Sequence, residues 1–430
     1  MKNDRVWSKT IFRLATALLA ASIFSGCSYG HREFNVGGVE TAVQAENVSL
    51  RVVQSDDFGS MWSTAHARDT LAFVDKQSQE ANTVVVLFIH GWHHNAAPDD
   101  ANLEHFQASL NELSKIFKTW YPDKKDEVKI IGVYVGWRGE SLPSALDYLT
   151  IWDRKPGAER VGEGDVSEFI ARLQLIYQTR QKDSPNHFMG LVSIGHSLGA
   201  QVLYKSVSKT LENGLIQNTD AFAGTGIGAE SQPLLVPPPV QSIGDIVLLV
   251  NPAIEAYQFQ RFHRLYRSRK YDDRQDPVLI VFSSETDRAR SVIFPMSRWV
   301  TRPFRPLFRT TEQAELFNKA LGDYEPQVTH VLEKAPDGAN ETLCGDDSDC
   351  LKREDLSGRV IMGNALMKPR PGVSEILYSP VLVSAVDPAI IDGHSDIFNP
   401  RFRLFLANYI AEIERKRLNR ADLKSAEKKE

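Results

Sequence analysis

The sequence has few cysteines, little net charge and no apolar run long enough to cross a membrane. It holds 3 cysteines in 430 residues and carries a formal net charge of −5. Without a global basic field, the composition does not point to nucleic acid, and we expect no nucleic-acid partner. No internal repeat is evident. With 42% hydrophobic and 24% charged residues, the chain is ordinary for a globular protein and allows one large domain with inserts or two domains.

The apolar segment near the N-terminus is short. Residues 14–24 are mostly apolar, whereas a membrane-spanning helix needs about 20 apolar residues. Basic residues precede this segment, and the small residues Ser25 and Gly26 follow it. The basic residues are Lys2, Arg5, Lys9 and Arg13. This order is typical of a secretory signal peptide, so residues 1–27 are set apart from the fold.

Cys27 directly follows Ser25-Gly26, and this arrangement resembles a bacterial lipobox, whose cysteine is lipidated and becomes the mature N-terminus. Phe24 stands where that motif prefers leucine, so an ordinary signal peptide with an incidental cysteine remains the alternative. Two or more acyl chains on one residue would anchor the protein stably. By analogy with known sorting rules, Ser28 after the cysteine favours the outer membrane. We therefore expect an exported protein, either an outer-membrane lipoprotein facing the periplasm or a periplasmic one.

The other two cysteines flank a short polar stretch. Cys344 and Cys350 enclose Gly-Asp-Asp-Ser-Asp, and in an oxidising periplasm they would close a small disulfide loop. The acidic residues of the stretch suggest calcium as an alternative, but they lack the loop pattern of an EF-hand. We expect the disulfide.

Buried strands alternate with amphipathic helices over most of the chain. The pattern predicts a tether and N-terminal extension over residues 28–80, a main domain over residues 81–415 and a charged tail over residues 416–430. Strands are expected at residues 83–89, 129–135, 188–194, 245–250, 277–283 and 381–386, and helices at residues 103–117, 166–176, 198–211 and 399–415. Runs of branched apolar residues alternating with helices favour an α/β protein whose mostly parallel sheet is covered on both faces.

Three stretches interrupt this alternation. They cover about residues 141–164, 213–242 and 299–370. The first is loop-like, the second is rich in glycine and proline, and the third is a large insert before the last expected strand. Long loops in compact domains usually carry function or are disordered, and we expect these inserts to form caps or lids.

The motif Gly195-His196-Ser197-Leu198-Gly199 satisfies the G-x-S-x-G pattern, in which a reactive serine stands on a sharp turn between a strand and a helix. Glycines two residues before and after the serine leave room for the turn. An expected strand ends at the motif and an amphipathic helix opens after it, which is the context that the pattern requires. Ser197 is therefore the candidate nucleophile.

The motif His90-Gly91-Trp92 ends an expected strand and resembles the His-Gly segment that lines the oxyanion hole of lipases and esterases. The backbone amides of Trp92 and Leu198 would donate hydrogen bonds to the oxyanion of a tetrahedral intermediate. We expect His90 to orient this loop through hydrogen bonds. His93 and His94 extend the histidine cluster, but no matching carboxylate or second histidine pair is visible, so we expect neither a metal nor a cofactor.

A reactive serine needs a histidine to take its proton and a carboxylate to hold that histidine. With a G-x-S-x-G serine, the acid and then the histidine follow along the chain. His394, shortly after the last expected strand, is the favoured base, and His330 inside the large insert is the alternative. Asp287 is the favoured acid because it lies deeper in its loop than the alternative, Glu285.

Taken together, residues 83–410 resemble a bacterial α/β-hydrolase of the lipase and esterase type, with the segments around His90, Ser197 and His394 as the matching points. Val135-Gly136-Trp137-Arg138-Gly139 also resembles a strand-end loop in a less characterised branch of such enzymes. The resemblance implies hydrolysis of a lipid-like or small carboxylester through an acyl-enzyme. Amide or thioester hydrolysis on the same fold, and a lipid-anchored scaffold or binding protein without turnover, remain the alternatives.

Overall fold

The computed structural model of the chain describes most of its length. The described residues are 32–35, 46–120, 127–140, 151–183, 187–217, 239–271, 273–287, 308–336, 356–374 and 376–427. Cys27, Cys344 and Cys350 lie outside them, as does most of the expected insert over residues 213–242. Within the described ranges, no helix combines the length and the apolar character that crossing a membrane requires.

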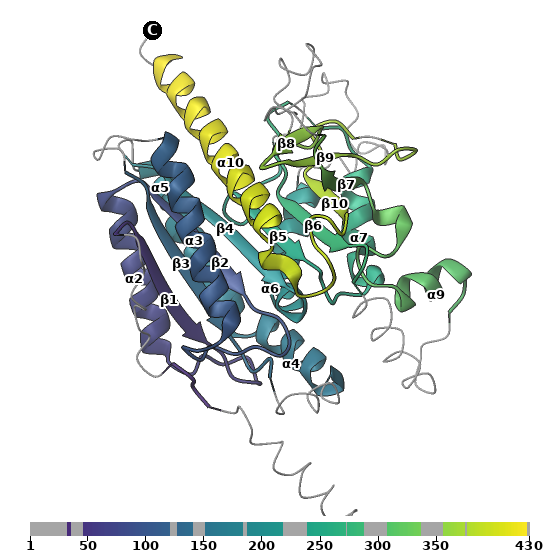
Figure 1. Ribbon diagram of the computed structural model, residues 1–430, viewed down its shortest axis with the longest axis horizontal. Helices are drawn as coiled ribbons and strands as arrows, with labels where there is room; N and C mark the ends of the chain where they lie inside the picture. The colour runs from purple at the N-terminus through teal and green to yellow at the C-terminus, as the bar shows by residue number, and fades with distance from the viewer. Residues whose placement is uncertain are drawn as a thin grey trace, which may run out of the picture.

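A single sheet of ten strands forms the centre of the protein, in the order β1-β3-β2-β4-β5-β6-β10-β7-β9-β8 (Figure 1). The strands are β1 (Val48–Gln54), β2 (Thr83–Ile89), β3 (Lys129–Gly136), β4 (Met189–His196), β5 (Ile246–Val250), β6 (Leu279–Ser284), β7 (His330–Lys334), β8 (Val360–Met362), β9 (Ala365–Pro369) and β10 (Val381–Val386). Across the sheet, each pair of neighbouring strands from β1 through β10 to β7 is parallel, and β9 runs antiparallel to β7 and β8. The expected α/β class with a mostly parallel sheet is confirmed.

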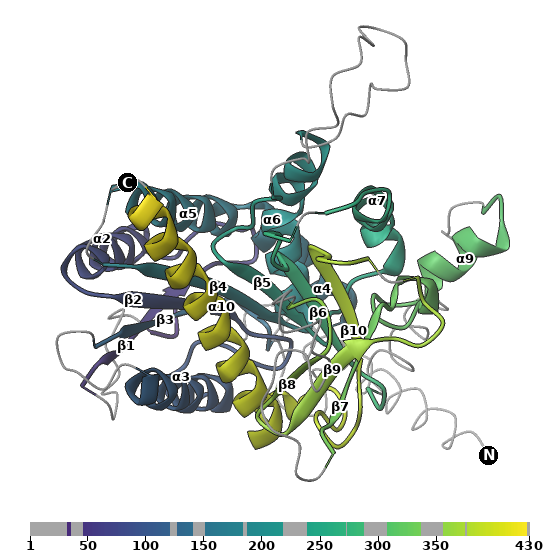
Figure 2. The same cartoon turned by 90° about the horizontal axis from the view of Figure 1, so that it is seen from above.

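Helices cover both faces of the sheet. They are α2 (Thr64–Glu80), α3 (Ala101–Trp120), α4 (Ile151–Glu163), α5 (Asp165–Asp183), α6 (Leu198–Gln217), α7 (Ala256–Arg267), α9 (Thr311–Asn318) and α10 (Pro400–Glu427), with short 3₁₀ turns η5 (Glu325–Gln327) and η6 (Asp396–Phe398). Seen from above, α3 and α10 lie on one side of the sheet and α2, α5 and α6 on the other (Figure 2). Two large apolar cores result, one on each face.

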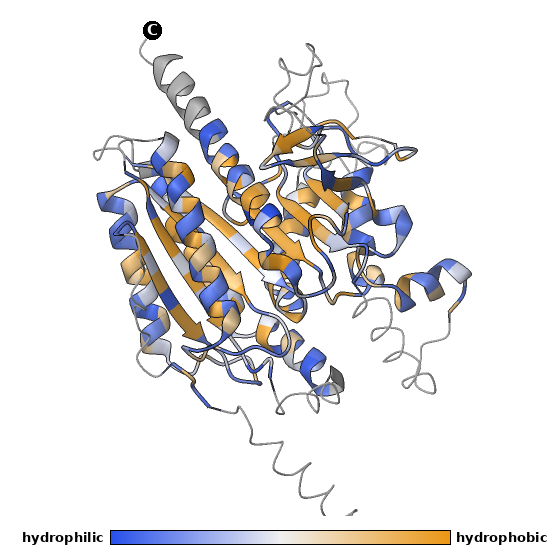
Figure 3. Ribbon diagram, viewed as in Figure 1, coloured by the Kyte–Doolittle hydropathy of each residue, from blue (hydrophilic) through white to orange (hydrophobic). Residues whose placement is uncertain are grey.

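The central strands form because their residues suit burial on both faces. β2 reads Thr-Val-Val-Val-Leu-Phe-Ile and is buried throughout, and β-branched residues pack well on a pleated surface. The strands are accordingly the most hydrophobic elements, while the helices turn polar faces outward (Figure 3). β2 and β10 have the bounds that the sequence predicts.

The N-terminal extension differs from the expectation. Residues 28–80 were expected to be a tether without a buried strand, yet β1 lies within them and pairs in parallel with β3 along its whole length. The strand reads Val-Ser-Leu-Arg-Val-Val-Gln, and its polar residues interrupt the apolar run. Arg51 places its guanidinium 3.8 Å from the centre of the Phe73 ring on α2. β1 is an edge strand and has a neighbouring strand on one side only. Such a strand tolerates polar residues, so it lacks the continuous apolar run by which buried strands are recognised.

Two of the expected inserts also contain regular structure. The stretch over residues 299–370 contributes α9, β7, β8 and β9, and the last three extend the sheet beyond β10. His330, the alternative base inside the expected large insert, is the first residue of β7. β7 was missed because its residues alternate between buried and half-buried positions. The loop-like insert over residues 141–164 contains α4, and α10 continues through most of the expected charged tail.

Candidate active site

The carboxyl ends of the parallel strands bring the candidate residues to one edge of the sheet. His90 follows β2, Ser197 follows β4, Asp287 comes shortly after β6, and His394 comes after β10. In open α/β sheets this edge is where ligands bind, because loops from neighbouring strands meet there. Which of these loops are neighbours depends on the order of the strands across the sheet and not on their order along the chain.

Ser197 stands between the end of β4 and the first residue of α6, Leu198. Its φ angle is 55°, in the left-handed region that non-glycine residues rarely occupy and that costs about 1–3 kcal/mol. The surrounding backbone holds this conformation. The amide of Ser197 donates to the carbonyl of Val250 at 3.0 Å, and its carbonyl accepts from the amides of Ala253 at 3.1 Å and Ala200 at 3.1 Å. The turn is thus fastened to β5 as well as to its own helix.

The two glycines of the motif are required by close contacts. A Cβ on Gly199 would lie 2.2 Å from the carbonyl oxygen of Ile89, and one on Gly195 would lie 2.7 Å from the Cα of Ala200. Both separations are shorter than any non-bonded contact that a methyl group tolerates. The helix can therefore pack directly against the ends of β2 and β4, and the turn that presents Ser197 stays tight.

His394 contacts both of the other candidate side chains. Its Nε2 lies 2.6 Å from Oγ of Ser197, and its Nδ1 lies 2.7 Å from Oδ2 of Asp287. Because an ionised carboxylate only accepts hydrogen bonds, Nδ1 carries the proton and donates it to Asp287. Nε2 is then the free acceptor for the hydroxyl of Ser197. This tautomer is the one that a general base for the serine needs.

The two alternative acids have different surroundings. The side chain of Asp287 is completely buried, and its amide donates to the carbonyl of Ser284 at 3.4 Å. Glu285 is exposed, although its own amide is tied to the carbonyl of Val386. Of the two carboxylates, Asp287 is the one that contacts His394. Asp245 and Glu255, two acidic residues near β5, are engaged elsewhere, with the hydroxyl of Tyr177 and the ammonium of Lys155 respectively.

His330, the alternative base, lies on the far side of β10 from this site. Its Nε2 donates to the carbonyl of Ser357 at 2.7 Å, and its Nδ1 lies 2.8 Å from the hydroxyl of Thr329. The residue is buried and connects β7 to the segment before β8. Its position indicates a structural role in the added strands.

The loop after β2 is organised around His90. Nδ1 of His90 donates to the carbonyl of Gly91 at 2.8 Å, and Nε2 accepts from the amide of Trp137 at 3.0 Å. The indole of Trp137 donates to the carbonyl of His90 at 2.8 Å and stacks on its ring at 5.8 Å. Burial lowers the pKa of His90 to about 4, so the ring is neutral at pH 7. His90 thus orients this loop through hydrogen bonds, as expected.

The backbone around Gly91 lies against the serine. A Cβ on Gly91 would come 2.9 Å from the Cβ of Ser197 and 2.9 Å from Nδ1 of His196. Trp92, the next residue, is half-buried. Leu198 is the first residue of α6, where an amide has no acceptor within its own helix. The positive end of that helix also favours negative charge. The neighbourhood of Gly91 and Leu198 is therefore suited to hold an oxyanion.

Two side chains that the sequence analysis did not single out contact the same site. Asn251, directly after β5, donates from Nδ2 to the carbonyl of His394 at 2.9 Å. His196, the residue before Ser197, donates from Nε2 to the same carbonyl at 2.9 Å. Burial, and secondarily the charge of His394, lowers the pKa of His196 to about 3, which keeps it neutral. A polar residue directly after a buried strand was the available sequence signal for Asn251.

The remaining histidines of the cluster contact ordinary partners. His94 places Nδ1 3.2 Å from a carboxylate oxygen of Asp100, and His93 stacks on Trp92 with ring centres 4.0 Å apart. Within the described ranges, no group of three or more histidine, cysteine or acidic side chains is arranged to hold a metal ion.

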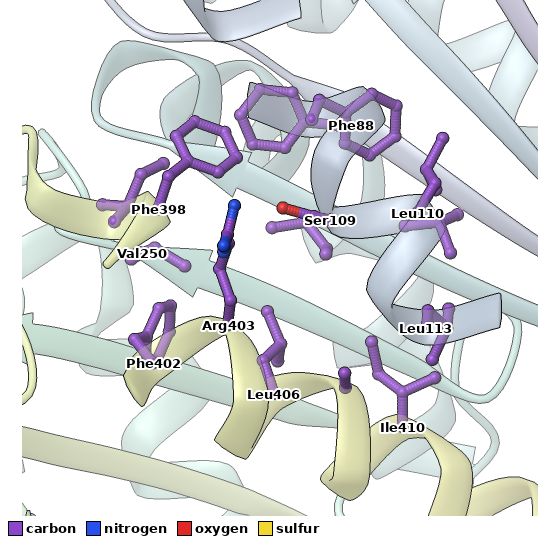
Figure 4. A pocket seen from close by; sticks show the side chains of 15 residues that line it. Phe88, Ser109, Leu110, Leu113, Val250, Phe398, Phe402, Arg403, Leu406 and Ile410 are labelled. Atoms are coloured by element: carbon purple, nitrogen blue, oxygen red, sulfur yellow. The ribbon is translucent and has the colours of Figure 1, made fainter. Parts of the chain in front are cut away.

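An apolar cavity of about 60 Å³ lies between α3 and α10 (Figure 4). Phe88, Leu110 and Phe398 are among the side chains that line it. Arg403 reaches into it from α10 and is paired with Glu112 at 2.7 Å. Ser197, Asp287 and His394 are not among its lining residues. The cavity is a gap in the packing of the two helices against the sheet.

Comparison of the chain with protein-family models, with curated protein sequences and with solved structures found no match. The interpretation of the site therefore rests on its own geometry.

Proposed function

We propose that the protein is a serine hydrolase with an α/β-hydrolase fold, which cleaves a carboxylester through an acyl-enzyme. The observation that carries the proposal is the hydrogen-bonded series from Ser197 through His394 to Asp287, with separations of 2.6 and 2.7 Å. The order of the three residues along the chain and the strand, turn and helix around Ser197 are those of the G-x-S-x-G hydrolases. A buried carboxylate, an oriented imidazole and a strained serine have no evident purpose in a binding protein.

In the proposed reaction, His394 takes the hydroxyl proton of Ser197 as its oxygen attacks the ester carbonyl. Asp287 stabilises the imidazolium that forms and keeps Nε2 directed at the serine. The tetrahedral intermediate collapses when His394 gives the proton to the departing alcohol, which leaves an acyl group on Ser197. Water then attacks the acyl group with His394 again as base, which releases the acid and restores the serine.

The amides of Leu198 and Trp92 are the proposed donors to the oxyanion. Each such donor contributes a few kcal/mol because it is fixed before the charge develops. The hydrogen bonds of His90 to Gly91 and Trp137 support this assignment, since they fix the loop that carries Trp92.

A fluorophosphonate probe tests the proposal directly, because it phosphonylates serines activated by a neighbouring base. The folded full-length chain should be labelled, and Ser197→Ala should not. Ser193→Ala is a matched control, since Ser193 lies on β4, is buried and has a hydroxyl with no hydrogen-bond partner among the described residues. It should be labelled like the wild type. A folded wild-type protein that resists the probe would instead favour the non-catalytic scaffold.

A substrate panel then separates the reaction classes. Matched p-nitrophenyl esters, p-nitroanilides and thioesters of increasing acyl length should give turnover that depends on Ser197. We expect the esters to be cleaved fastest. Faster cleavage of anilides or thioesters at equal chain length would replace the ester assignment by the corresponding alternative.

We also propose that Cys27 carries the lipid anchor, which would place the hydrolase at the outer membrane facing the periplasm. The proposal is supported by the lipobox-like Ser-Gly-Cys sequence after the apolar segment. Metabolic labelling with an alkyne-tagged fatty acid should mark the wild-type chain and not Cys27→Ala. An unlabelled wild type that is cleaved and released into the periplasm would show an ordinary signal peptide.

A further inference from the structure

We propose that Asn251 is a positioning residue that sets the alignment of His394 with both Ser197 and Asp287. This inference rests on the proposed function, because it concerns the geometry of the same reaction. Asn251 follows β5, the strand between β4, which leads to Ser197, and β6, which leads to Asp287. It is completely buried and forms hydrogen bonds with the end of β6 and with the loop after β10.

The backbone amide and both side-chain polar atoms of Asn251 are engaged at the edge of the sheet. Its amide donates to the carbonyl of Phe282 at 2.7 Å, and its Oδ1 accepts from the amide of Ser284 at 2.8 Å. Its Nδ2 donates to the carbonyls of Gly393 at 3.1 Å and His394 at 2.9 Å. One side chain thus joins the end of β6, three residues before Asp287, to the backbone of the proposed base.

The loop that carries His394 is packed into the core at Ile390 and Ile391, whereas its tip at Gly393 and His394 is held mainly by polar contacts. Gly393 has a φ angle of 87°, and a Cβ placed on it would meet no atom within 4 Å. The side chain of His394 is 23% exposed. The amide of Gly393 donates to the hydroxyl of Thr286 at 2.9 Å, and the carbonyl of Ile391 accepts from the hydroxyl of Ser284 at 2.7 Å. Asn251 and His196 supply the two donors to the carbonyl of His394 itself.

The backbone conformation of Asn251 also indicates a selected position. Its φ angle is 46°, which asparagine tolerates better than most residues but glycine tolerates best. If the position required only the left-handed backbone conformation, glycine would meet that requirement at least as well. The side-chain amide is therefore the property that the position uses, and a glycine variant separates the two requirements.

The experiment compares three variants of the full-length chain by the rate of fluorophosphonate labelling. Asn251→Gly keeps the backbone conformation and removes all three side-chain hydrogen bonds, to Ser284, Gly393 and His394. Asn251→Asp keeps an acceptor for the amide of Ser284 and loses the donor to His394. Asn364→Gly is the control, because Asn364 also has a left-handed φ angle, 65°, but lies between β8 and β9. We expect labelling to slow about 10- to 100-fold in both Asn251 variants, the loss that a small misplacement of a reacting group produces, and to be unchanged in the control.

Two further readouts separate positioning from loss of folded structure. Asn251→Gly should remain folded at the assay temperature with a cooperative thermal transition, at a midpoint lowered because the buried amide of Ser284 loses its acceptor. The downfield proton resonance of the His394 Nδ1–H, hydrogen-bonded to Asp287, should be present in the wild type and broadened or absent in both Asn251 variants. Loss of folded structure in both variants would make Asn251 a folding residue and overturn the inference.

The outcomes distinguish this inference from the proposed function. A wild type that is labelled, with Asn251 variants labelled at the same rate, would overturn the role of Asn251 and leave the hydrolase proposal standing. A folded wild type that is not labelled would remove the hydrolase proposal, and the role of Asn251 with it.

Discussion

His394 and Ser197 are separated by 197 positions in the chain, yet the imidazole Nε2 lies 2.6 Å from the hydroxyl oxygen. The contact exists because β4 and β10 both end at the same edge of the sheet, with β5 and β6 between them. The segment around Asn251 spans that gap, since Val250 and Ala253 bond the backbone of Ser197 while Asn251 bonds the backbone of His394. Changes to this network should therefore have measurable and distinct effects.

The first prediction concerns the acid. Asp287→Asn should slow fluorophosphonate labelling roughly 10⁴-fold, because an amide that replaces the carboxylate favours the wrong tautomer of the histidine and cannot stabilise the imidazolium. Glu285→Gln should leave the rate unchanged, since Glu285 is exposed and two residues away. Second-order labelling rates of the two variants check this. A larger loss with Glu285→Gln would transfer the role of the acid to that residue.

The second prediction uses two glycines of the same helix, α6. Gly199→Ala should destabilise the protein by about 1–3 kcal/mol or more, the range for inserting a methyl group into a packed region, because the new Cβ would lie 2.2 Å from the carbonyl oxygen of Ile89. Gly214→Ala should stabilise it by about 0.5–1 kcal/mol through helix propensity, since the nearest atoms to its Cβ lie at 3.8 Å. Urea unfolding measures both. Equal effects of the two substitutions would contradict the packing argument.

The third prediction concerns pH and His90, whose burial lowers its pKa from 6.5 to about 4. Below pH 6.5 the unfolded chain gains a proton at this histidine that the folded protein does not, so stability is complete above that pH and falls as the pH drops toward 4. Linkage gives a loss of about 2 kcal/mol from this group between pH 7 and pH 5. In urea unfolding, the wild type should lose that much more than His90→Gln. An identical loss in both proteins would show that His90 titrates normally in the folded state.

The fourth prediction concerns a buried ion pair between α4 and the segment that follows β1. Arg154 is completely buried, and its guanidinium lies 2.8 Å from Oδ1 of Asp57 and 2.9 Å from the carbonyl of Arg138. Asp57→Asn should destabilise the protein by about 3 kcal/mol, because it removes the buried carboxylate that Arg154 and Arg138 share and leaves Arg154 paired only with the exposed Asp153. The double variant Asp57→Asn with Arg154→Met should lose less than Asp57→Asn alone. Urea unfolding at pH 7 checks both, and a double variant less stable than the single one would refute the argument.

Much of the fold was predictable because buried strands leave a strong signal. The continuous apolar runs of β2 and β10 predicted the first and last residues of both strands. The glycines around Ser197 predicted the turn. β1 and β7 were missed because each lies toward the outside of the parallel part of the sheet, where half-buried polar residues such as Arg51 and Glu333 are tolerated. A pattern based on continuous apolar residues cannot recognise such strands.

The sequence by itself determined the elements and the kinds of group available, because backbone propensity, burial pattern and turn chemistry are local properties of neighbouring residues. It also narrowed the base to His394 or His330 and the acid to Asp287 or Glu285. Only the tertiary structure decided which histidine reaches Ser197 and which carboxylate contacts that histidine. Only it revealed that Asn251 and His196 donate to the backbone carbonyl of His394. Those contacts depend on the order of the strands across the sheet, because that order brings together residues far apart in the chain. The local sequence around each residue does not contain this information.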